Sequence, residues 1–284
     1  MLGKIVYKIK KKIFPLVGAF DTSKDYTISK NYSCLKGKVV VVTGGSGHIG
    51  RSIVCKLAAE GAIVYVCGTN NDRVNSVVEE VTSKLKGIAY PIILNVMDAS
   101  NIEKVFNGII DKENRIDILV NCAGGGSRGS ARNIVDQYVD VIDDVLNLNL
   151  RGSILCVRAV APIMRERGWG RIIDIGSAVA TGGLCKYSEY AAAKAGCIAF
   201  VRSVAMELGK YGITANCVSP GKVQRGLMTE DIFNKIKKTN WLNSYGTAED
   251  ISEMVAYLCS DKARFITGQN FIVDGGRSLG LKGE

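Results

Sequence analysis

The chain has 284 residues, of which 47% are hydrophobic and 23% charged, a balance that suits a globular protein and speaks against disorder, collagen or a coiled coil. Its net charge is +10, but residues 1–38 hold nine lysines against two aspartates, so that 28 basic and 25 acidic residues remain in the rest. Because charge is nearly balanced beyond residue 38, we expect no nucleic-acid partner.

The nine cysteines are scattered and never form a CxxC pair, and the chain has a single histidine. This usage excludes a zinc site by spacing and is typical of a reducing compartment. Apolar runs fall short of the roughly 20 residues of a membrane span, and four lysines between positions 8 and 12 interrupt any signal-peptide core. We therefore expect a cytoplasmic protein without a metal.

Residues 1–36 are predicted to be a basic N-terminal extension. Within residues 1–14, apolar residues recur at helical spacing opposite lysines until Pro15 ends the pattern. A helix of this kind could lie peripherally on an anionic inner membrane surface or dock on another subunit. A disordered tail is the alternative.

From residue 37 onward, short apolar runs alternate with helical patterns. We predict strands over 39–42, 62–67, 89–94, 116–120, 171–175, 214–218 and 270–273, and helices over 53–59, 73–85, 105–110, 139–164, 190–208 and 248–259, the fourth bent around residues 151–152. Such alternation indicates parallel strands joined by right-handed crossovers. Residues 37–284 are therefore predicted to form a single α/β domain, a Rossmann-like doubly wound sheet between two layers of helices.

The first predicted strand runs into the glycine-rich segment TGGSGHIG, residues 43–50, which opens the first helix. Glycines in such a turn let backbone N–H groups approach a pyrophosphate, whose charge the helix N-terminus stabilises. Gly44, Gly47 and Gly50 are the candidates. A strand before the turn and a helix after it favour dinucleotide binding over a tight turn alone.

The end of the second predicted strand bears on the choice of cofactor. An acid at this point would hold the adenosine ribose hydroxyls of NAD and repel the 2′-phosphate of NADP. The sequence has Gly68, Thr69 and Asn70 there, with Arg73 one helical turn later. We therefore expect NADP(H) to be favoured, with NAD(H) possible, and a solvated Arg73 is the alternative reading of that residue.

Three residues that could handle a proton lie at the ends of later elements. Ser177 ends a predicted strand, and YAAAK places Tyr190 and Lys194 four residues apart on a helix, about 5–6 Å from each other. A unit charge at that distance would stabilise the phenolate by roughly 3 kcal/mol, or about two pKa units. Tyr190 could then act as a general acid or base while Ser177 binds the reacting oxygen. An incidental exposed Tyr–Lys pair is the alternative.

With these motifs, residues 37–277 resemble the short-chain dehydrogenase/reductase family, in the compact single-domain type that includes the 3-oxoacyl-acyl-carrier-protein reductases. The family's signals occur in its order: TGGSGHIG, NCAG, NLRG, IGS, YAAAK, SPG, ITGQ and VDGG. The step from Ser177 to Tyr190 is also the family's 13 residues. The resemblance implies an oxidoreductase that moves a hydride between NAD(P)(H) and a carbonyl or secondary alcohol, and a homotetramer built on helices 139–164 and 190–208.

The resemblance also implies roles for individual residues. Tyr190 would be the catalytic acid or base, Lys194 would lower its pKa and bind the nicotinamide ribose, Ser177 would position the substrate oxygen, and Asn149 would hold a water of the proton relay. The other residues implied to contact the cofactor are Gly44, Ser46, Gly47, Ile49, Gly50, Thr69, Asn70, Asn95, Val96, Asn121, Ala123, Gly124, Pro220, Gly221 and Val223.

Three positions depart from the family's pattern. His48 stands where the compact type has glycine, which gives the turn the spacing of the larger epimerase and dehydratase branch; we expect its side chain to pack or face solvent. Asn95 replaces an aspartate on the adenine side. The threonine that commonly follows the PG turn is replaced near Arg225, a cation that either pairs with an anionic substrate or stays solvated on the predicted lid, residues 222–246.

Two other functions remain open at this point. A sugar-nucleotide epimerase or dehydratase is suggested by the glycine spacing, although the chain is too short for that branch's added C-terminal substrate domain. A non-catalytic dinucleotide-binding scaffold is the other alternative. An intact set of Asn149, Ser177, Tyr190 and Lys194 speaks against it, because a scaffold needs none of them.

Overall fold

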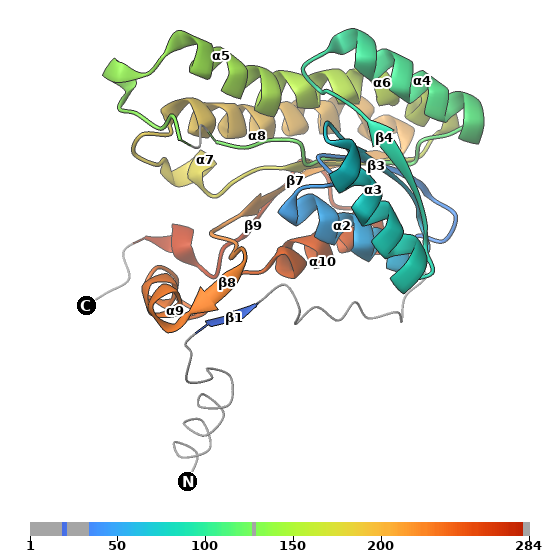
Figure 1. Ribbon diagram of the computed structural model, residues 1–284. Helices are drawn as coiled ribbons and strands as arrows, with labels where there is room; N and C mark the ends of the chain where they lie inside the picture. Colours follow the sequence, from blue (N-terminus) through green and yellow to red (C-terminus); the bar gives the residue numbers. More distant parts are fainter. Residues whose placement is uncertain (1–18, 22–33, 127–128, 281–284) are drawn as a thin grey trace.

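The structure is a computed structural model that describes residues 19–21, 34–126 and 129–280. Its main sheet has seven parallel strands in the spatial order β4-β3-β2-β5-β6-β7-β9 (Figure 1). They are β2 (Val39–Thr43), β3 (Ile63–Gly68), β4 (Ile88–Ile93), β5 (Ile118–Asn121), β6 (Gly170–Ile175), β7 (Ile213–Pro220) and β9 (Asn270–Val273). The order reverses between β2 and β5, and in such sheets ligands bind outside the carboxyl ends of the strands at this point. The predicted Rossmann-like doubly wound α/β fold is confirmed.

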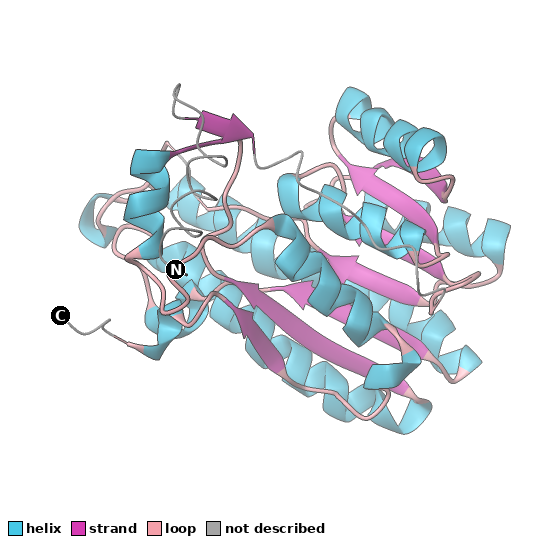
Figure 2. Cartoon of the chain, turned by 90° about the horizontal axis from the view of Figure 1, so that it is seen from below, coloured by secondary structure: helices cyan, strands magenta, loops and turns pink. Residues whose placement is uncertain are grey.

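Helices cover both faces of the sheet (Figures 1 and 2). One layer holds α2 (His48–Ala59), α3 (Asn71–Glu79) and α10 (Ala248–Cys259), and the other holds α4 (Ala99–Glu113), α5 (Val139–Leu146), α6 (Gly152–Arg167) and α8 (Ser188–Leu208). Successive strand side chains point to opposite faces, so each strand feeds both layers. Val40 and Val42 belong to the apolar cluster beneath α2 and α10, whereas Val39 and Val41 belong to the cluster beneath α4, α6 and α8.

Local sequence sets where several helices begin and bend. The Thr247 hydroxyl accepts a hydrogen bond from the Asp250 N–H, and the Asp250 carboxylate accepts one from the Thr247 N–H, which is a capping box at the start of α10. α4 begins earlier than predicted because the Asp98 carboxylate accepts the N–H groups of Ser100 and Asn101. The bend predicted near residue 151 is a π-helical turn, Asn147–Arg151, between α5 and α6.

The predicted helix 73–85 is divided. It is α-helical to Glu79 and continues as a π-helical turn, Glu80–Lys84. The Thr82 and Ser83 hydroxyls donate to carbonyl oxygens one turn earlier, of Val78 and Glu79, and such bonds compete with the regular helical pattern.

The predicted lid contains structure that the sequence patterns did not indicate. Residues 222–246 include the strand β8 (Leu227–Thr229) and the helix α9 (Glu230–Lys237), and a short helix, α7 (Val179–Gly182), follows β6. β8 pairs antiparallel with β1 (Ala19–Asp21), so a segment of the N-terminal extension lies beside the lid (Figure 1). The division into an extension, 1–36, and a domain, 37–284, stays a prediction, and residues 1–14 lie outside the described residues.

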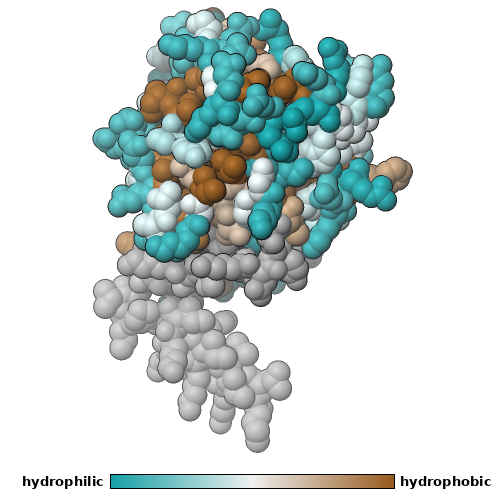
Figure 3. All heavy atoms as spheres, turned by 90° about the vertical axis from the view of Figure 1, so that its right-hand side faces the viewer, coloured by the Kyte–Doolittle hydropathy of each residue, from teal (hydrophilic) through white to brown (hydrophobic). Residues whose placement is uncertain are grey.

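β4 forms one edge of the main sheet and leaves Ile88, Tyr90 and Ile93 partly exposed. On this side of the molecule, apolar surface is interspersed with polar surface (Figure 3). Pro91 gives β4 one backbone N–H fewer, and the Lys112 ammonium lies 3.5 Å from the centre of the Tyr90 ring. A proline and a nearby lysine both make an edge strand a poorer template for pairing.

Along the part of the chain that the structure describes, each helix is either too short or too polar to cross a membrane.

Candidate active site

A cleft of about 640 Å³ opens at the carboxyl ends of the central strands. It brings together most of the residues singled out in the sequence, which come from seven separate segments. Those that line it are Gly44, Ser46, Gly47, Ile49, Gly50, Thr69, Asn95, Val96, Ala123, Gly124, Ser177, Tyr190, Lys194, Pro220, Gly221 and Val223. The predicted residues that do not line it are Asn70, Asn121 and Asn149.

The glycine turn between β2 and α2 is a cradle that side chains would fill. Gly44 has a φ of 63°, and a Cβ there would lie 2.7 Å from the Cα of Ala123. A Cβ on Gly50 would collide with the carbonyl oxygen of Gly44. Because α2 has no acidic residue in its first turn, the partial positive charge of its N-terminus is uncompensated locally. This is the arrangement that a phosphate group requires.

The charge of the cleft favours an anionic ligand. Lys194, Lys222 and Arg225 line it, and none of its described lining residues is an aspartate or a glutamate. Within the described ranges, no group of three or more His, Cys, Asp or Glu side chains is placed to hold a metal ion.

At the end of β3, Thr69 faces the cleft but Asn70 does not. The Asn70 Oδ1 accepts a hydrogen bond of 2.9 Å from the Arg73 N–H and so caps α3. A Cβ on Gly68 would lie 2.8 Å from the Ser46 Oγ and 2.9 Å from the Val74 Cγ2, so an acid could not be placed there unless these side chains moved. Thr69 is therefore the residue after β3 whose side chain faces the cleft.

Tyr190 and Lys194 lie one turn apart on α8, as predicted, and both face the cleft. The Lys194 Nζ is 5.9 Å from the centre of the Tyr190 ring and donates a hydrogen bond of 2.7 Å to the Ile175 carbonyl oxygen. Lys194 is only 5% exposed, so its charge is poorly screened by water. Ser177 comes two residues after that carbonyl and lines the same cleft.

Asn149 lies behind this group in the π-helical turn and is fully buried. Its Oδ1 accepts the Gly125 N–H at 3.0 Å, and its Nδ2 donates to the carbonyl oxygens of Gly125 and Val145, both at 2.9 Å. The side chain thus ties the loop after β5 to the bend between α5 and α6. A Cβ on Gly124 would lie 2.6 Å from this Oδ1 and 3.2 Å from the Lys194 Nζ. That Asn149 holds a water stays a prediction.

Asn121 is also turned away from the cleft. Its Nδ2 donates a hydrogen bond of 2.8 Å to the Asp174 Oδ1 on the neighbouring strand β6. Asp174 is 1% exposed, and its Oδ2 has no hydrogen-bond partner within the described structure. Burial raises the pKa of Asp174 to about 6, although the Asn121 hydrogen bond, the charge of Lys194 and a hydrogen bond with the Ser153 side chain each lower it. We did not predict this residue, although a lone acid inside the apolar run RIIDI was the visible signal.

His48 lies at the start of α2 and lines the cleft. Its Nε2 is 2.9 Å from the Gln224 carbonyl oxygen, so this nitrogen carries the proton and donates it. Burial lowers the pKa of His48 below its usual value. The residue is thus a neutral link between the glycine turn and the segment after β7, in agreement with a packing role.

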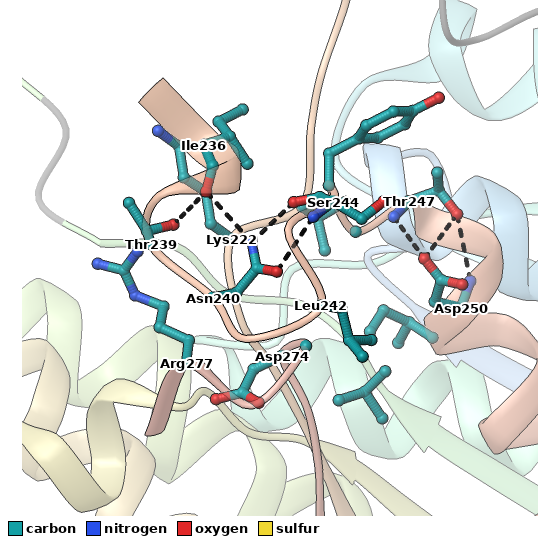
Figure 4. A pocket seen from close by; sticks show the side chains of 16 residues that line it. Lys222, Ile236, Thr239, Asn240, Leu242, Ser244, Thr247, Asp250, Asp274 and Arg277 are labelled. Carbon is teal, nitrogen blue, oxygen red and sulfur yellow. Dashed lines mark hydrogen bonds between the residues drawn. The ribbon is translucent and has the colours of Figure 1, made fainter. Parts of the chain in front are cut away.

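A second cavity, of about 240 Å³, lies beside the cleft and shares Lys222 and Val223 with it (Figure 4). Part of its wall is the loop after α9, where the Asn240 Nδ2 donates to the carbonyl oxygens of Ile236 at 3.1 Å and Ser244 at 2.7 Å. These bonds fix the shape of the lid. This cavity could not be predicted from sequence patterns, because its walls come from several separate segments.

Comparison with known proteins gives consistent matches over the same span. A family model described as enoyl-(acyl carrier protein) reductase matches residues 34–278. The 3-oxoacyl-acyl-carrier-protein reductase FabG of Aquifex aeolicus is 35% identical over 247 residues, which cover 85% of this chain and 98% of the relative. The FabG of Staphylococcus aureus strain Mu50 is 36% identical over 245 residues, 84% of this chain and 97% of the relative.

Among solved structures, a short-chain type dehydrogenase/reductase from Mycobacterium ulcerans superposes with a TM-score of 0.81 at 24% identity. The match covers 87% of this chain and 92% of that one. At this identity the likeness bears on the fold alone.

Proposed function

The chain belongs to the short-chain dehydrogenase/reductase family of NAD(P)-dependent oxidoreductases, and we propose that it transfers a hydride between NADP(H) and a carbonyl or secondary alcohol. The observation that supports this most directly is the meeting of two sites in one cleft. The glycine cradle at α2 forms one part, and Ser177, Tyr190 and Lys194 form another.

The residues present fit a dinucleotide. The cradle of Gly44 and Gly50 leaves room that a Cβ would fill, and the N-terminus of α2 and the cations of the cleft suit a diphosphate. Thr69 would contact the adenosine ribose, and Lys194 the nicotinamide ribose. When bound, the dinucleotide supplies the hydride, while the protein contributes orientation and charge.

The remaining chemistry is a proton transfer carried by this chain's own residues. In the reducing direction, the Tyr190 hydroxyl donates its proton to the carbonyl oxygen, which the Ser177 hydroxyl also holds by a hydrogen bond. The Lys194 ammonium, 5.9 Å from the ring centre, stabilises the negative charge left on the phenolate oxygen. In the oxidising direction the same phenolate accepts the proton of the alcohol.

We propose a 3-oxoacyl thioester as the substrate, because relatives of that printed name match this chain over 98% and 97% of their length. Purified protein should oxidise NADPH when a 3-oxoacyl thioester is supplied, and the rate of NADPH oxidation should be higher than with simple ketones or keto sugars. The absorbance of NADPH measures this rate directly. Absence of oxidation across all three substrate panels would contradict the proposed function, and a preference for sugars would favour the epimerase branch.

Cofactor choice should be controlled at Thr69. Thr69→Asp places a carboxylate beside the site of the 2′-phosphate, and we expect the ratio of NADPH to NADH affinity to fall roughly 10- to 100-fold, equivalent to about 1–3 kcal/mol of repulsion. Fluorescence titration of both cofactors measures the ratio. Asn75→Asp adds the same charge to an exposed position of α3 outside the cleft, and should change the ratio little.

If wild-type protein binds NADH as tightly as NADPH, the preference for NADP(H) is wrong. If both aspartate variants shift the ratio equally, the effect is one of net charge and Thr69 does not read the ribose.

The homotetramer implied by the resemblance also remains a proposal. Its helices α6 and α8 leave Ile154 and Met206 exposed, at 37% and 79%, and enclose a shallow cavity of about 340 Å³ between them. Exposed apolar side chains on adjacent helices are suited to packing against a second copy.

A further inference from the structure

The segment after β7 carries a cation on the wall of the cleft that faces the glycine turn. Arg225 is exposed to the cleft, whose lining at this point also includes Gly47 and His48. By the resemblance, the threonine that commonly follows the PG turn is replaced near Arg225. A guanidinium offers a longer reach and more donors than a hydroxyl, so its surroundings indicate which ligand it could serve.

The backbone that leads into Arg225 is fixed by several contacts. The Gln224 N–H donates to the Gly246 carbonyl oxygen at 2.9 Å, beside a bridge between Val223 and Gly246. The Gln224 carbonyl oxygen accepts the His48 Nε2–H at 2.9 Å, and the Gln224 Nε2 donates to the Arg225 carbonyl oxygen at 3.1 Å. Arg225 is therefore held one residue from a direct contact with the first residue of α2.

The field of Arg225 reaches groups on both sides of the glycine turn. Burial lowers the pKa of His48, and the nearby charge of Arg225 lowers it further. Burial raises the pKa of Cys122 to about 11, and the charge of Arg225 opposes this rise. His48 begins α2, and Cys122 follows β5. Arg225 thus projects its charge into the space between β5 and the N-terminus of α2, where the cradle faces a phosphate.

We propose that Arg225 binds the diphosphate of the dinucleotide from the lid side of the cleft, opposite the glycine cradle and the N-terminus of α2. The inference rests on the proposed function, because it requires a dinucleotide in this cleft. The planar guanidinium can donate two parallel hydrogen bonds to phosphate oxygens, whereas the backbone N–H groups of the turn approach from the other side. Arg225 then couples the position of the lid to the presence of the cofactor.

A binding experiment separates this role from other uses of the cation. The diphosphate is common to NADPH and NADH, so Arg225→Gln should weaken both by the same factor, roughly 10- to 100-fold for the loss of charged hydrogen bonds. Adenosine 2′-monophosphate has the adenosine and the 2′-phosphate but no diphosphate, and its affinity should change less than about twofold. Arg225→Lys keeps the charge but cannot donate two parallel hydrogen bonds, so its affinities for NADPH and NADH should lie between those of wild type and Arg225→Gln.

Lys235→Gln is the matched control, because it removes one positive charge from an exposed position of α9 that does not line the cleft. It should leave all three dissociation constants nearly unchanged. A loss for NADPH alone would place Arg225 at the 2′-phosphate and overturn the proposal. Unchanged cofactor affinities with a raised KM for the substrate would assign it to the substrate and overturn it too.

Failure of the proposed function would look different. If wild-type protein binds neither NADPH nor NADH, the dinucleotide site itself is refuted, and the role of Arg225 falls with it. If wild type binds both and Arg225→Gln binds them equally well, only the diphosphate contact is refuted.

Discussion

Tyr190→Phe should reduce turnover by roughly three orders of magnitude while the dissociation constant for NADPH changes less than about twofold. The substitution removes one hydroxyl, and with it the only proton that we assign to the substrate oxygen; a positioned general acid or base contributes about 10²- to 10⁴-fold to the rate. The ring itself stays, so the packing of α8 beside the cleft is preserved. Steady-state kinetics and fluorescence titration on the same preparation measure the two quantities.

Tyr187→Phe provides the matched control. Tyr187 lines the same cleft and lies three residues before Tyr190, at the N-cap of α8, but the residue four positions after it is Ala191 and not a lysine. Removal of its hydroxyl should therefore cost far less. Full activity of Tyr190→Phe, or an equal loss in both variants, would refute the proton transfer assigned to Tyr190.

The strands could be predicted to within about two residues because their sequences are short apolar runs with clear punctuation. β2 has the sequence VVVVT and is buried throughout, as a central strand covered on both faces must be. The predicted helix 248–259 has the bounds of α10 because the Thr247 cap and its apolar stripe agree. The lid was not predicted in detail: β8 has only three residues, and its pairing with β1 joins segments more than 200 residues apart, which local pattern cannot reveal.

Residues of the cleft could be predicted where the position of the backbone alone brings them to it. Prediction was less successful where the direction of a side chain decides whether it faces the cleft. Gly44, Ser177 and Pro220 end parallel strands or follow them, and such ends meet at one edge of the sheet. Three predicted side chains form hydrogen bonds within the protein instead of facing the cleft. The Asn70 side chain accepts the Arg73 N–H, the Asn121 side chain donates to Asp174, and the Asn149 side chain donates to the Val145 carbonyl oxygen. The direction of such side chains depends on tertiary contacts that the sequence does not show.

The spacing of the glycine turn also has a local explanation. His48, where the compact family type has glycine, donates to the Gln224 carbonyl oxygen across the cleft. This hydrogen bond gives a structural reason for a histidine at position 48, so the glycine spacing does not require a relationship to the epimerase branch. Its partner is 176 residues away in sequence, so the motif alone could not distinguish the two readings.

Asp174 should make the folded protein less stable as pH rises from about 4 to about 6. The carboxyl keeps its proton in the folded state up to a pKa of about 6, whereas its usual value is 3.8, so the folded state binds more protons over this interval. Stability therefore falls with rising pH, and above about pH 6 the full cost of a buried carboxylate is present. A difference of about two pKa units corresponds to roughly 3 kcal/mol.

Asp174→Asn should remove this cost at neutral pH. An asparagine keeps an oxygen that can accept the Asn121 Nδ2 hydrogen bond, and it does not ionise, so the variant's free energy of unfolding relative to wild type should rise by roughly 2 kcal/mol between about pH 4 and about pH 8. Urea denaturation at fixed protein concentration measures the difference at each pH. A constant difference across the range would show that Asp174 ionises in the folded protein much as it does in the unfolded chain.

Asp117→Asn is the matched control, because this second buried aspartate is fully engaged. Its carboxylate accepts the Val39 N–H at 2.8 Å and two bonds from the Arg115 guanidinium, at 2.6 and 2.7 Å. Neutralising it leaves Arg115 without its counter-ion, so we expect a loss of stability at neutral pH where Asp174→Asn gives a gain. Opposite signs from the same substitution would show that the cost of burying an aspartate depends on its partners: the Asp174 Oδ2 has no hydrogen-bond partner within the described structure, whereas Asp117 is paired with Arg115.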